Sequence, residues 1–196
     1  TEFFSPGPYR DHGYLLNVGR LDDPRKNIPL LLRAYAAART RLPTLPRLVL
    51  AGPALPAPEA WQLVSALHLT GNVEYIWPQD RRAVADTYRG ASAFVLSSNE
   101  EGQGIVIVEA MASGLPVVAT SCIGPSELIT DDVEGLLTPV RSVERLADAI
   151  VRISTDPGLR HRMSQAARSR AVKEFSLDSA GAQLCRVYRT AGITRH

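Results

Sequence analysis

Two glutamates that bracket a glycine-rich turn are the residues whose types and spacing best suggest chemistry. Glu101 and Glu109 stand in an E-x7-E arrangement, with Gly102 and Gly104 between them, shortly after the apolar run 93–96. A helix is predicted to begin in this turn, and the first N–H groups of a helix are unpaired and lie at the positive end of its dipole. Carboxylates accept hydrogen bonds and repel anions, whereas helix N-termini attract anions. The stretch therefore predicts a site for a ligand that is part sugar and part phosphate.

Arg20 and Lys26 supply the positive charge that the glutamates lack. Both lie in the loop 19–27, directly after the apolar run 14–18. Arginine offers a forked pair of donors and lysine a point charge, a combination that suits the two phosphates of a nucleotide diphosphate. The alternative is that both are solvated loop charges.

Each glutamate also has a simpler explanation. Glu109 could be a helix-surface residue, and Glu101 could be a turn residue that the helix dipole stabilises. However, Glu109 stands between Val108 and Ala110 in an otherwise apolar helix, where an unpaired carboxylate is costly. A partner is therefore expected, and the ribose diol of a ligand would serve.

The elements that must position these residues alternate between strands and helices. Short apolar runs predict strands at 14–18, 47–51, 73–76, 93–96, 116–120 and 135–137. Helices are predicted at 28–43, 59–69, 81–89, from the glycine turn to 114, at 127–129, and between 143 and 191. This alternation predicts an α/β fold, a Rossmann-like parallel sheet with helices on both faces. Ligands of such sheets bind at the carboxyl ends of strands, which here lead into the polar turns 19–27, 97–105 and 120–126.

The composition of the chain argues against nucleic-acid binding, a metal site and a membrane span. The chain has 196 residues, a formal charge of +2, 45% hydrophobic residues and 21% charged residues, which is ordinary for a globular protein that does not bind nucleic acid. Two cysteines and four histidines show no metal-ligand spacing, so no metal site is expected. No apolar run is long enough to span a membrane, and the first residues lack the basic region of a signal peptide. A cytoplasmic location is expected.

The motifs also resemble those of a known family. The chain is similar to the C-terminal domain of the retaining GT-B glycosyltransferases of family four, also called group 1. The resemblance extends over nearly the whole chain, and its most specific part is the block 101–120, EGQGIVIVEAMASGLPVVAT. Further matching stretches are 17–21, 26–27, 124–129, 134–137 and 175–176.

The resemblance implies a role for each site residue in binding and transfer of a nucleotide sugar. Arg20 and Lys26, beside Gly19, would hold the donor's diphosphate and stabilise the charge that develops as the nucleotide leaves. Glu101 would contact the transferred sugar, so Arg20, Lys26 and Glu101 are the expected catalytic residues. Glu109 would bind the ribose hydroxyls.

The remaining implied contacts are to the phosphates, the sugar and the base. Backbone N–H groups from Gly102, Gln103, Gly104 and Ile105 would meet phosphate and sugar hydroxyls. The nucleobase would lie near Ile76 and Trp77, where Trp77 either stacks on it or is a structural aromatic. Transfer in this family retains the anomeric configuration and needs neither a metal nor another cofactor.

Two residues depart from the family pattern, and the first of them bears on the sugar. The family often has an aromatic residue at the position of Gln103 and a second glycine at the position of Ile123. The Gln103 amide could bond a sugar hydroxyl instead, so the hexose preference is left open. The base, the acceptor and the oligomeric state are left open as well.

Length sets the expected domain organisation. GT-B enzymes have two domains, so residues 1–13 are expected to be an interdomain linker and 14–175 the nucleotide-sugar-binding domain. Residues 176–196 are expected to form a helix that packs toward a missing N-terminal domain, which would carry the acceptor site. Alone, the chain is expected to bind donor and to be largely inactive. Peripheral membrane contact is left open for the full-length enzyme.

Other functions remain as alternatives. A GT-B-like phosphorylase would need a lysine for pyridoxal phosphate, and only Lys26 and Lys173 exist. An epimerase fragment or a non-catalytic interaction module would use the same fold. A dinucleotide-binding domain is disfavoured because no G-x-G-x-x-G follows the first strand. The basic stretch 160–173 is interpreted as a solvated face, with a membrane or acceptor surface as the alternative.

Overall fold

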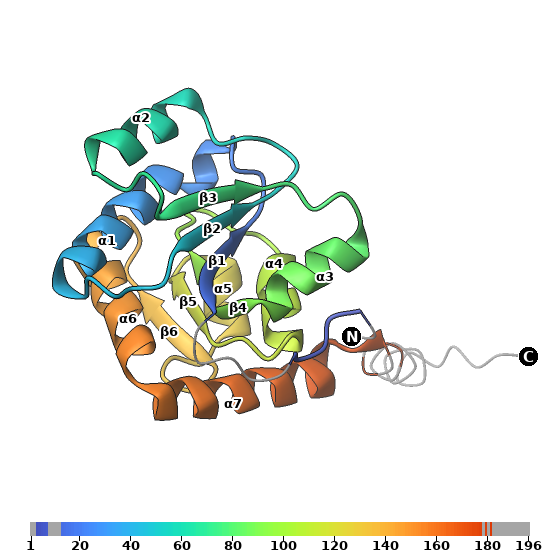
Figure 1. Ribbon diagram of the computed structural model, residues 1–196. Helices are drawn as coiled ribbons and strands as arrows, with labels where there is room; N and C mark the ends of the chain where they lie inside the picture. Colours follow the sequence, from blue (N-terminus) through green and yellow to red (C-terminus); the bar gives the residue numbers. More distant parts are fainter. Residues whose placement is uncertain (1–2, 8–12, 178, 180, 182–196) are drawn as a thin grey trace, which may run out of the picture.

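The six short apolar runs form one parallel sheet, which confirms the predicted fold class (Figure 1). The computed structural model describes residues 3–7, 13–177, 179 and 181. The strands are β1 (Tyr14–Val18), β2 (Leu48–Ala51), β3 (Val73–Ile76), β4 (Ala91–Leu96), β5 (Val117–Thr120) and β6 (Gly135–Thr138). Their order is β3-β2-β1-β4-β5-β6, and neighbouring strands run parallel. The order reverses between β1 and β4, and ligands of such sheets bind in the crevice at this switch point.

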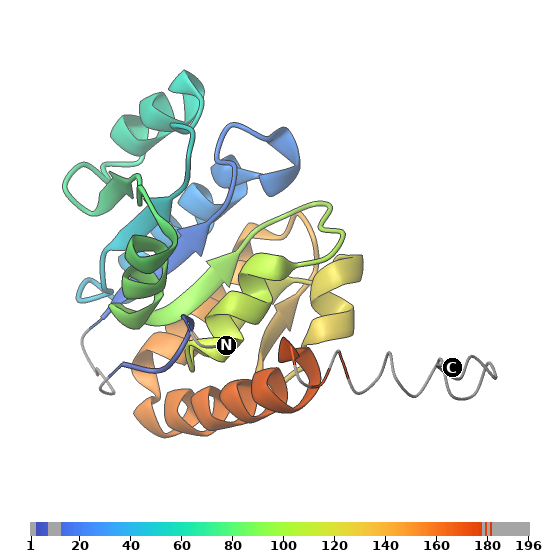
Figure 2. The same cartoon turned by 90° about the vertical axis from the view of Figure 1, so that its right-hand side faces the viewer.

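Helices cover both faces of the sheet (Figures 1 and 2). They are η1 (Pro24–Lys26, a 3₁₀ turn), α1 (Ile28–Arg41), α2 (Pro58–Ala66), α3 (Arg81–Arg89), α4 (Ile105–Ala112), α5 (Ile123–Leu128), α6 (Val143–Thr155) and α7 (Pro157–Phe175). One core joins α1, α2 and α6 to the sheet, and the other joins α3, α4 and α7 to its opposite face. Alternate strand residues enter different cores: Leu15 and Val95 face the first, Leu16 and Phe94 the second.

Two segments that were predicted as turns or loops contain helical structure. The loop 19–27 contains the 3₁₀ turn Pro24–Lys26, which the Asp23 carboxylate caps by accepting from Arg25 N (3.0 Å). The second half of the turn predicted at 120–126 is instead part of helix α5, which begins at Ile123. Pro125 fits there because the first turn of a helix does not use its N–H groups for internal bonds.

The segment before β1 packs onto the second core. Phe4 is 5% exposed and meets the ring of Tyr88 edge-on, with 5.6 Å between the ring centroids. The guanidinium of Arg168 donates to the carbonyl oxygen of Phe4 (3.0 Å), and that of Arg89 donates to the carbonyl oxygen of Phe3 (2.5 Å). Residues 3–5 are thereby fixed to α3 and α7.

The division into a linker at 1–13, a domain at 14–175 and a helix at 176–196 stays a prediction. Most of the segment 176–196, which is predicted to form a helix, lies outside the described residues. Within the described part of the chain, every helix is too short or too polar to cross a membrane.

Candidate functional site

The loops that follow β1 and β4 are joined to each other at the switch point. The Ser97 hydroxyl donates to the carbonyl oxygens of Lys26 (2.8 Å) and Asn27 (3.1 Å). The Asn99 N–H donates to Arg25 O (2.8 Å), and the Asn27 amide donates to Asn99 Oδ1 (3.1 Å). Because two loops hold each other, side chains that are distant in sequence keep fixed positions over the sheet edge.

A cavity of about 700 Å³ opens above these loops. It brings together Arg20, Lys26, Glu101 and Gly102 from the sequence-predicted set. Its other lining residues are Arg25, Asn99, Glu100, Ser121, Cys122, Ile123 and Val140. Burial raises the pKa of the Cys122 thiol, so this group is held as the neutral thiol. The cavity has the size and the mixed charge of a site for a polar ligand with anionic and hydroxylated parts.

Lys26 and Glu101, which both line the cavity, form an ion pair with each other. Their side chains are 16% and 12% exposed, so solvent screens the pair less than a surface pair. The two residues are 75 positions apart, and they meet because β1 and β4 are neighbours in the sheet. In this state the positive and the negative group of the site neutralise each other.

A second charged group flanks this pair. The Asp23 carboxylate accepts from the guanidinium groups of Arg20 (2.9 Å) and Arg25 (2.7 Å). The hydrogen bonds from the Arg25 side chain and its backbone N–H hold the pKa of Asp23 well below its usual range. Sequence reasoning missed Arg25, although its place beside Lys26 in a cationic loop was a usable signal.

Glu109 has a protein partner that the sequence did not reveal. Its carboxylate accepts a hydrogen bond from the hydroxyl of Tyr88 on α3 (3.0 Å), and it does not line the 700 Å³ cavity. Burial raises the pKa of Glu109, while the Tyr88 hydrogen bond and the charge of Arg81 oppose that rise. The expectation that the half-buried carboxylate needs a partner therefore stands, with Tyr88 as the one the structure supplies.

The other predicted binding residues do not line the cavity. Gly19 donates its N–H to Ala51 O (3.0 Å), and Ile76 ends β3 half-buried against the second core. Trp77 is 56% exposed just beyond β3, which does not fit a buried structural aromatic. Gln103 and Ile105 are exposed, and Gly104 caps α4 in the left-handed region (φ 60°). The ligand contacts of these residues stay predictions.

Two glycines outside the predicted site allow its loops to approach closely. A Cβ on Gly124 would lie 2.7 Å from Glu101 O and 2.8 Å from Gly102 O, while the Gly124 N–H donates to Glu101 O (2.9 Å). A Cβ on Gly52 would lie 2.0 Å from Gly19 O. Both glycines therefore act on the site through the backbone.

Gly124→Ala is expected to cost about 1–3 kcal/mol of unfolding free energy, because the new methyl group must push the Glu101 loop outward. The same shift would move Glu101 away from Lys26 and weaken ligand binding. Thermal unfolding measures the first effect, and titration calorimetry the second. Gly102→Ala is the stability control, since a Cβ on Gly102 would have no atom of the described residues within 4 Å. Equal stability of the two variants would contradict the prediction.

Glu109→Gln is expected to stabilise the fold at neutral pH. The raised pKa means that the folded state holds the Glu109 proton more tightly than the unfolded state. Stability due to this group is therefore present at low pH and is lost as pH rises through the raised pKa. At pH 7 the amide should raise the melting temperature, because it needs no desolvated charge in the folded state. Melting curves at pH 4 and pH 7 test this, and the gain should shrink at pH 4.

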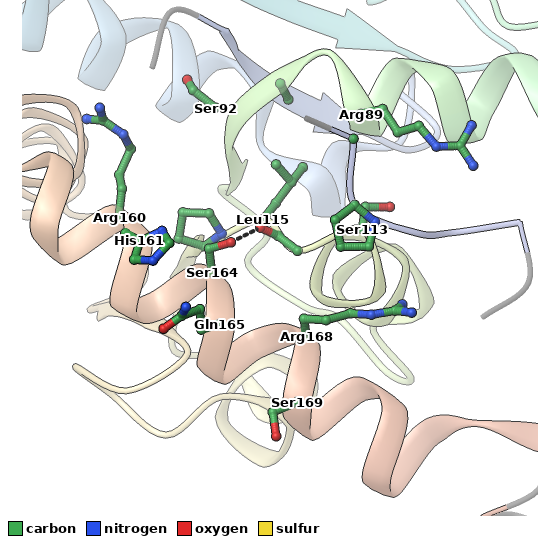
Figure 3. Close-up of a pocket in the computed structure, with 15 residues that line it drawn as sticks. Arg89, Ser92, Ser113, Leu115, Arg160, His161, Ser164, Gln165, Arg168 and Ser169 are labelled. Atoms are coloured by element: carbon green, nitrogen blue, oxygen red, sulfur yellow. Dashed lines mark hydrogen bonds between the residues drawn. The ribbon is translucent and has the colours of Figure 1, made fainter. Parts of the chain in front are cut away.

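A second cavity, of about 530 Å³, lies at the opposite end of β4 and β5 (Figure 3). Arg89, Ser92, Ser113, Leu115, Arg160, His161, Ser164, Gln165, Arg168 and Ser169 are among its lining residues. The Ser164 hydroxyl closes part of it by donating to Gly114 O (2.5 Å). Since none of the predicted site residues lines it, this cavity is separate from the candidate site.

Comparisons with known proteins agree with the geometry. The family model described as "Glycosyl transferases group 1" matches residues 1–170. The chain is 38% identical to a D-inositol 3-phosphate glycosyltransferase of Kribbella flavida, over 96% of this chain and 46% of the relative. It is 32% identical to an alpha-D-kanosaminyltransferase of Streptomyces kanamyceticus, over 93% of this chain and 47% of the relative. The chain thus spans about half the length of the curated relatives it matches.

Solved structures show the same fold. A sucrose-phosphate synthase from Thermosynechococcus elongatus superposes with a TM-score of 0.84 at 27% identity, covering 97% of this chain and 50% of the synthase. The C-terminal domain of a glycosyl transferase group 1 family protein from Francisella tularensis superposes with a TM-score of 0.80 at 22% identity. It covers 90% of this chain and 97% of that domain.

Proposed function

The chain belongs to the glycosyl transferases of group 1, and on that premise we propose that it is the donor-binding domain of a retaining glycosyltransferase. The whole enzyme would move a hexosyl group from a nucleoside diphosphate sugar to an acceptor. An N-terminal domain outside this chain would carry the acceptor site. The relatives, of which the chain covers about half, support a domain of a longer enzyme.

One observation carries the proposal: the meeting of Lys26 and Glu101 at the switch point of the sheet. Lysine binds phosphate as a point charge, and a carboxylate accepts from sugar hydroxyls. A nucleoside diphosphate sugar presents both groups side by side. It would therefore replace the single ion pair by two complementary contacts in the 700 Å³ cavity.

The transfer step follows from the same charges. As the bond between the sugar and the diphosphate breaks, negative charge grows on the leaving phosphate. Lys26, Arg20 and the N–H groups at the start of α4 would stabilise that charge. Glu101 would hold the sugar while the acceptor attacks from the same face, which retains the anomeric configuration. Glu109 would accept from the ribose hydroxyls.

Titration calorimetry of the 196-residue chain with UDP, GDP, ADP and their glucose conjugates tests donor binding. We expect saturable binding of at least one of the three nucleotides. Glu109→Ala should weaken it about tenfold, the value of one hydrogen bond to a charged group. Absence of binding to all of these ligands by a chain with a cooperative melting transition would overturn the proposal.

The full-length enzyme tests the remaining parts. Its product should keep the anomeric configuration of the donor, which the coupling constant of the anomeric proton reports. Activity that survives Glu101→Ala unchanged would instead favour the non-catalytic module, since Glu101 would then have no part in transfer.

A further inference from the structure

We propose that Tyr88 is a positioning residue, which fixes the Glu109 carboxylate in the orientation that accepts the donor's ribose hydroxyls. The inference rests on the proposed function, and it adds a residue of α3 that lies outside the loops 19–27 and 97–105. Tyr88 acts through Glu109 and is not expected to touch the donor.

The hydrogen bonds of Tyr88 define one orientation of Glu109. The phenol hydroxyl lies 3.0 Å from Glu109 Oε2 and 3.2 Å from the carbonyl oxygen of Val106, one turn earlier on α4. Within the described residues no second donor reaches the Glu109 carboxylate. A carboxylate has about four acceptor positions, so Oε1 and the rest of Oε2 stay available for a diol.

The ring of Tyr88 is held from two sides. Phe94 of β4 lies against it with 5.9 Å between the centroids, and Phe4 meets it edge-on at 5.6 Å. The side chain is fully buried (0% exposed). A ring clamped in this way cannot change rotamer without opening the core, so its hydroxyl is a fixed point from which Glu109 is oriented.

Phe4 links this contact to the segment before β1. Its carbonyl oxygen accepts from Arg168, which also donates to Ala112 O at the end of α4 (2.5 Å). The same guanidinium thus holds Phe4 and the helix that carries Glu109. The order of contacts is Phe4, Tyr88, Glu109, so a change in the seating of Phe4 reaches Glu109 through the Tyr88 ring.

The charge of Glu109 depends on the same hydroxyl. Burial raises the pKa of Glu109, and the groups that face it, Tyr88 and Arg81 of α3, both lower it. Loss of the Tyr88 hydroxyl would therefore push the pKa of Glu109 further upward. The carboxylate would lose its orientation and would take up a proton at a higher pH, and each change weakens its bonds to the ribose.

Tyr88→Phe tests the proposal, because it removes only the hydroxyl. Calorimetry would compare UDP, GDP and ADP with their 2′-deoxy counterparts, and the ratio of the two dissociation constants reports the ribose contact. We expect the wild-type chain to prefer the ribose form about tenfold. Tyr88→Phe should reduce that preference to about threefold or less, with the lost affinity confined to the ribose form.

Tyr35→Phe is the matched control. Tyr35 is also fully buried, and its hydroxyl is shared between Pro46 O (2.9 Å) and Asn72 O (3.2 Å), away from the site. It should lower stability by a similar amount and leave the ribose preference at its wild-type value. As pH falls, the affinity of Tyr88→Phe should also begin to drop at a higher pH than that of the wild type, a change that loss of packing would not produce.

The possible outcomes distinguish the proposed ribose contact of Glu109 from the positioning role of Tyr88. A wild-type chain that binds none of the nucleotides, or binds ribose and deoxyribose forms equally, overturns the proposed role of Glu109 and this inference with it. A wild-type ribose preference that Tyr88→Phe retains overturns the positioning role alone. If Tyr88→Phe does not fold, Phe4→Ala decides: a reduced preference supports the proposal, and an unchanged preference overturns it.

Discussion

Lys26→Met is expected to weaken nucleoside diphosphate binding about 100-fold, the largest single loss that we expect in this chain. The ammonium group of Lys26 lines the cavity and is mostly buried, and its bonds to phosphate oxygens would be charge-assisted. The methionine keeps most of the length of the side chain, so the loss reports charge and not volume. Titration calorimetry with UDP, GDP and ADP measures it.

Lys173→Met is the control, because Lys26 and Lys173 are the only lysines of the chain. Lys173 is exposed near the end of α7 and lies outside the residues that line the cavity. Lys173→Met changes the net charge by the same amount as Lys26→Met and should leave the affinity for nucleotide unchanged. Equal losses in the two variants would mean that net charge, and not the site, attracts the nucleotide.

Glu101→Gln is expected to change the affinities for bare nucleotide and nucleotide sugar in opposite directions. In the free chain Lys26 is held by Glu101, so a diphosphate must first break that ion pair. In this variant the neutral amide no longer forms the ion pair with Lys26. The bare nucleoside diphosphate should therefore bind about threefold to tenfold more tightly. The same change removes a charged acceptor for the sugar, so the preference for nucleotide sugar over nucleotide should fall about tenfold or more.

Glu100→Gln is a close control for this variant. Glu100 precedes Glu101 in the same loop and lines the same cavity, but it is exposed, and the partner of Lys26 is Glu101. A general effect of removing one negative charge would appear in both variants. Tighter nucleotide binding by Glu100→Gln alone, or by neither variant, would contradict the competition between Glu101 and the diphosphate.

The Lys26–Glu101 ion pair stabilises the free site before a donor binds. A partly buried lysine or glutamate without a partner would cost free energy, and each removes that cost for the other. On the proposed function, the donor supplies both partners again, phosphate for Lys26 and sugar hydroxyls for Glu101. Binding would then leave neither charge unpaired.

The sequence by itself determined the kinds of elements and most of the chemical groups of the site. Apolar runs such as 93–96 are short and lie between helical patterns, and this local periodicity is sufficient to predict a parallel sheet covered on both faces. Arg20, Lys26 and Glu101 were recognisable because each stands just after a predicted strand. The type of a residue and its position along the chain are local properties, so the sequence alone is sufficient to predict these elements and groups.

The start of helix α5 and the place of Arg25 in the site were not predicted, because they depend on contacts between segments that are distant in sequence. Helix α5 contains Gly124 and Pro125, which locally indicate a turn. Gly124 is tolerated because of a neighbour distant in sequence, since only a residue without Cβ can approach Glu101 O at this point. Arg25 had a local signal in its place beside Lys26, but its contact with the Asn99 loop and its place in the cavity wall depend on the folded chain.

The tertiary structure alone decided which groups meet. Strand order places β4 beside β1, and this brings Glu101 to Lys26 across 75 positions of the chain. Packing of α3 against α4 brings Tyr88 to Glu109, and the segment before β1 adds Phe4 behind it. Such pairings depend on the order in which strands and helices assemble, while the periodicity of each segment reports only which of its faces is buried. The sequence therefore identified the groups of the site, and the fold decided that each glutamate is already paired before any ligand arrives.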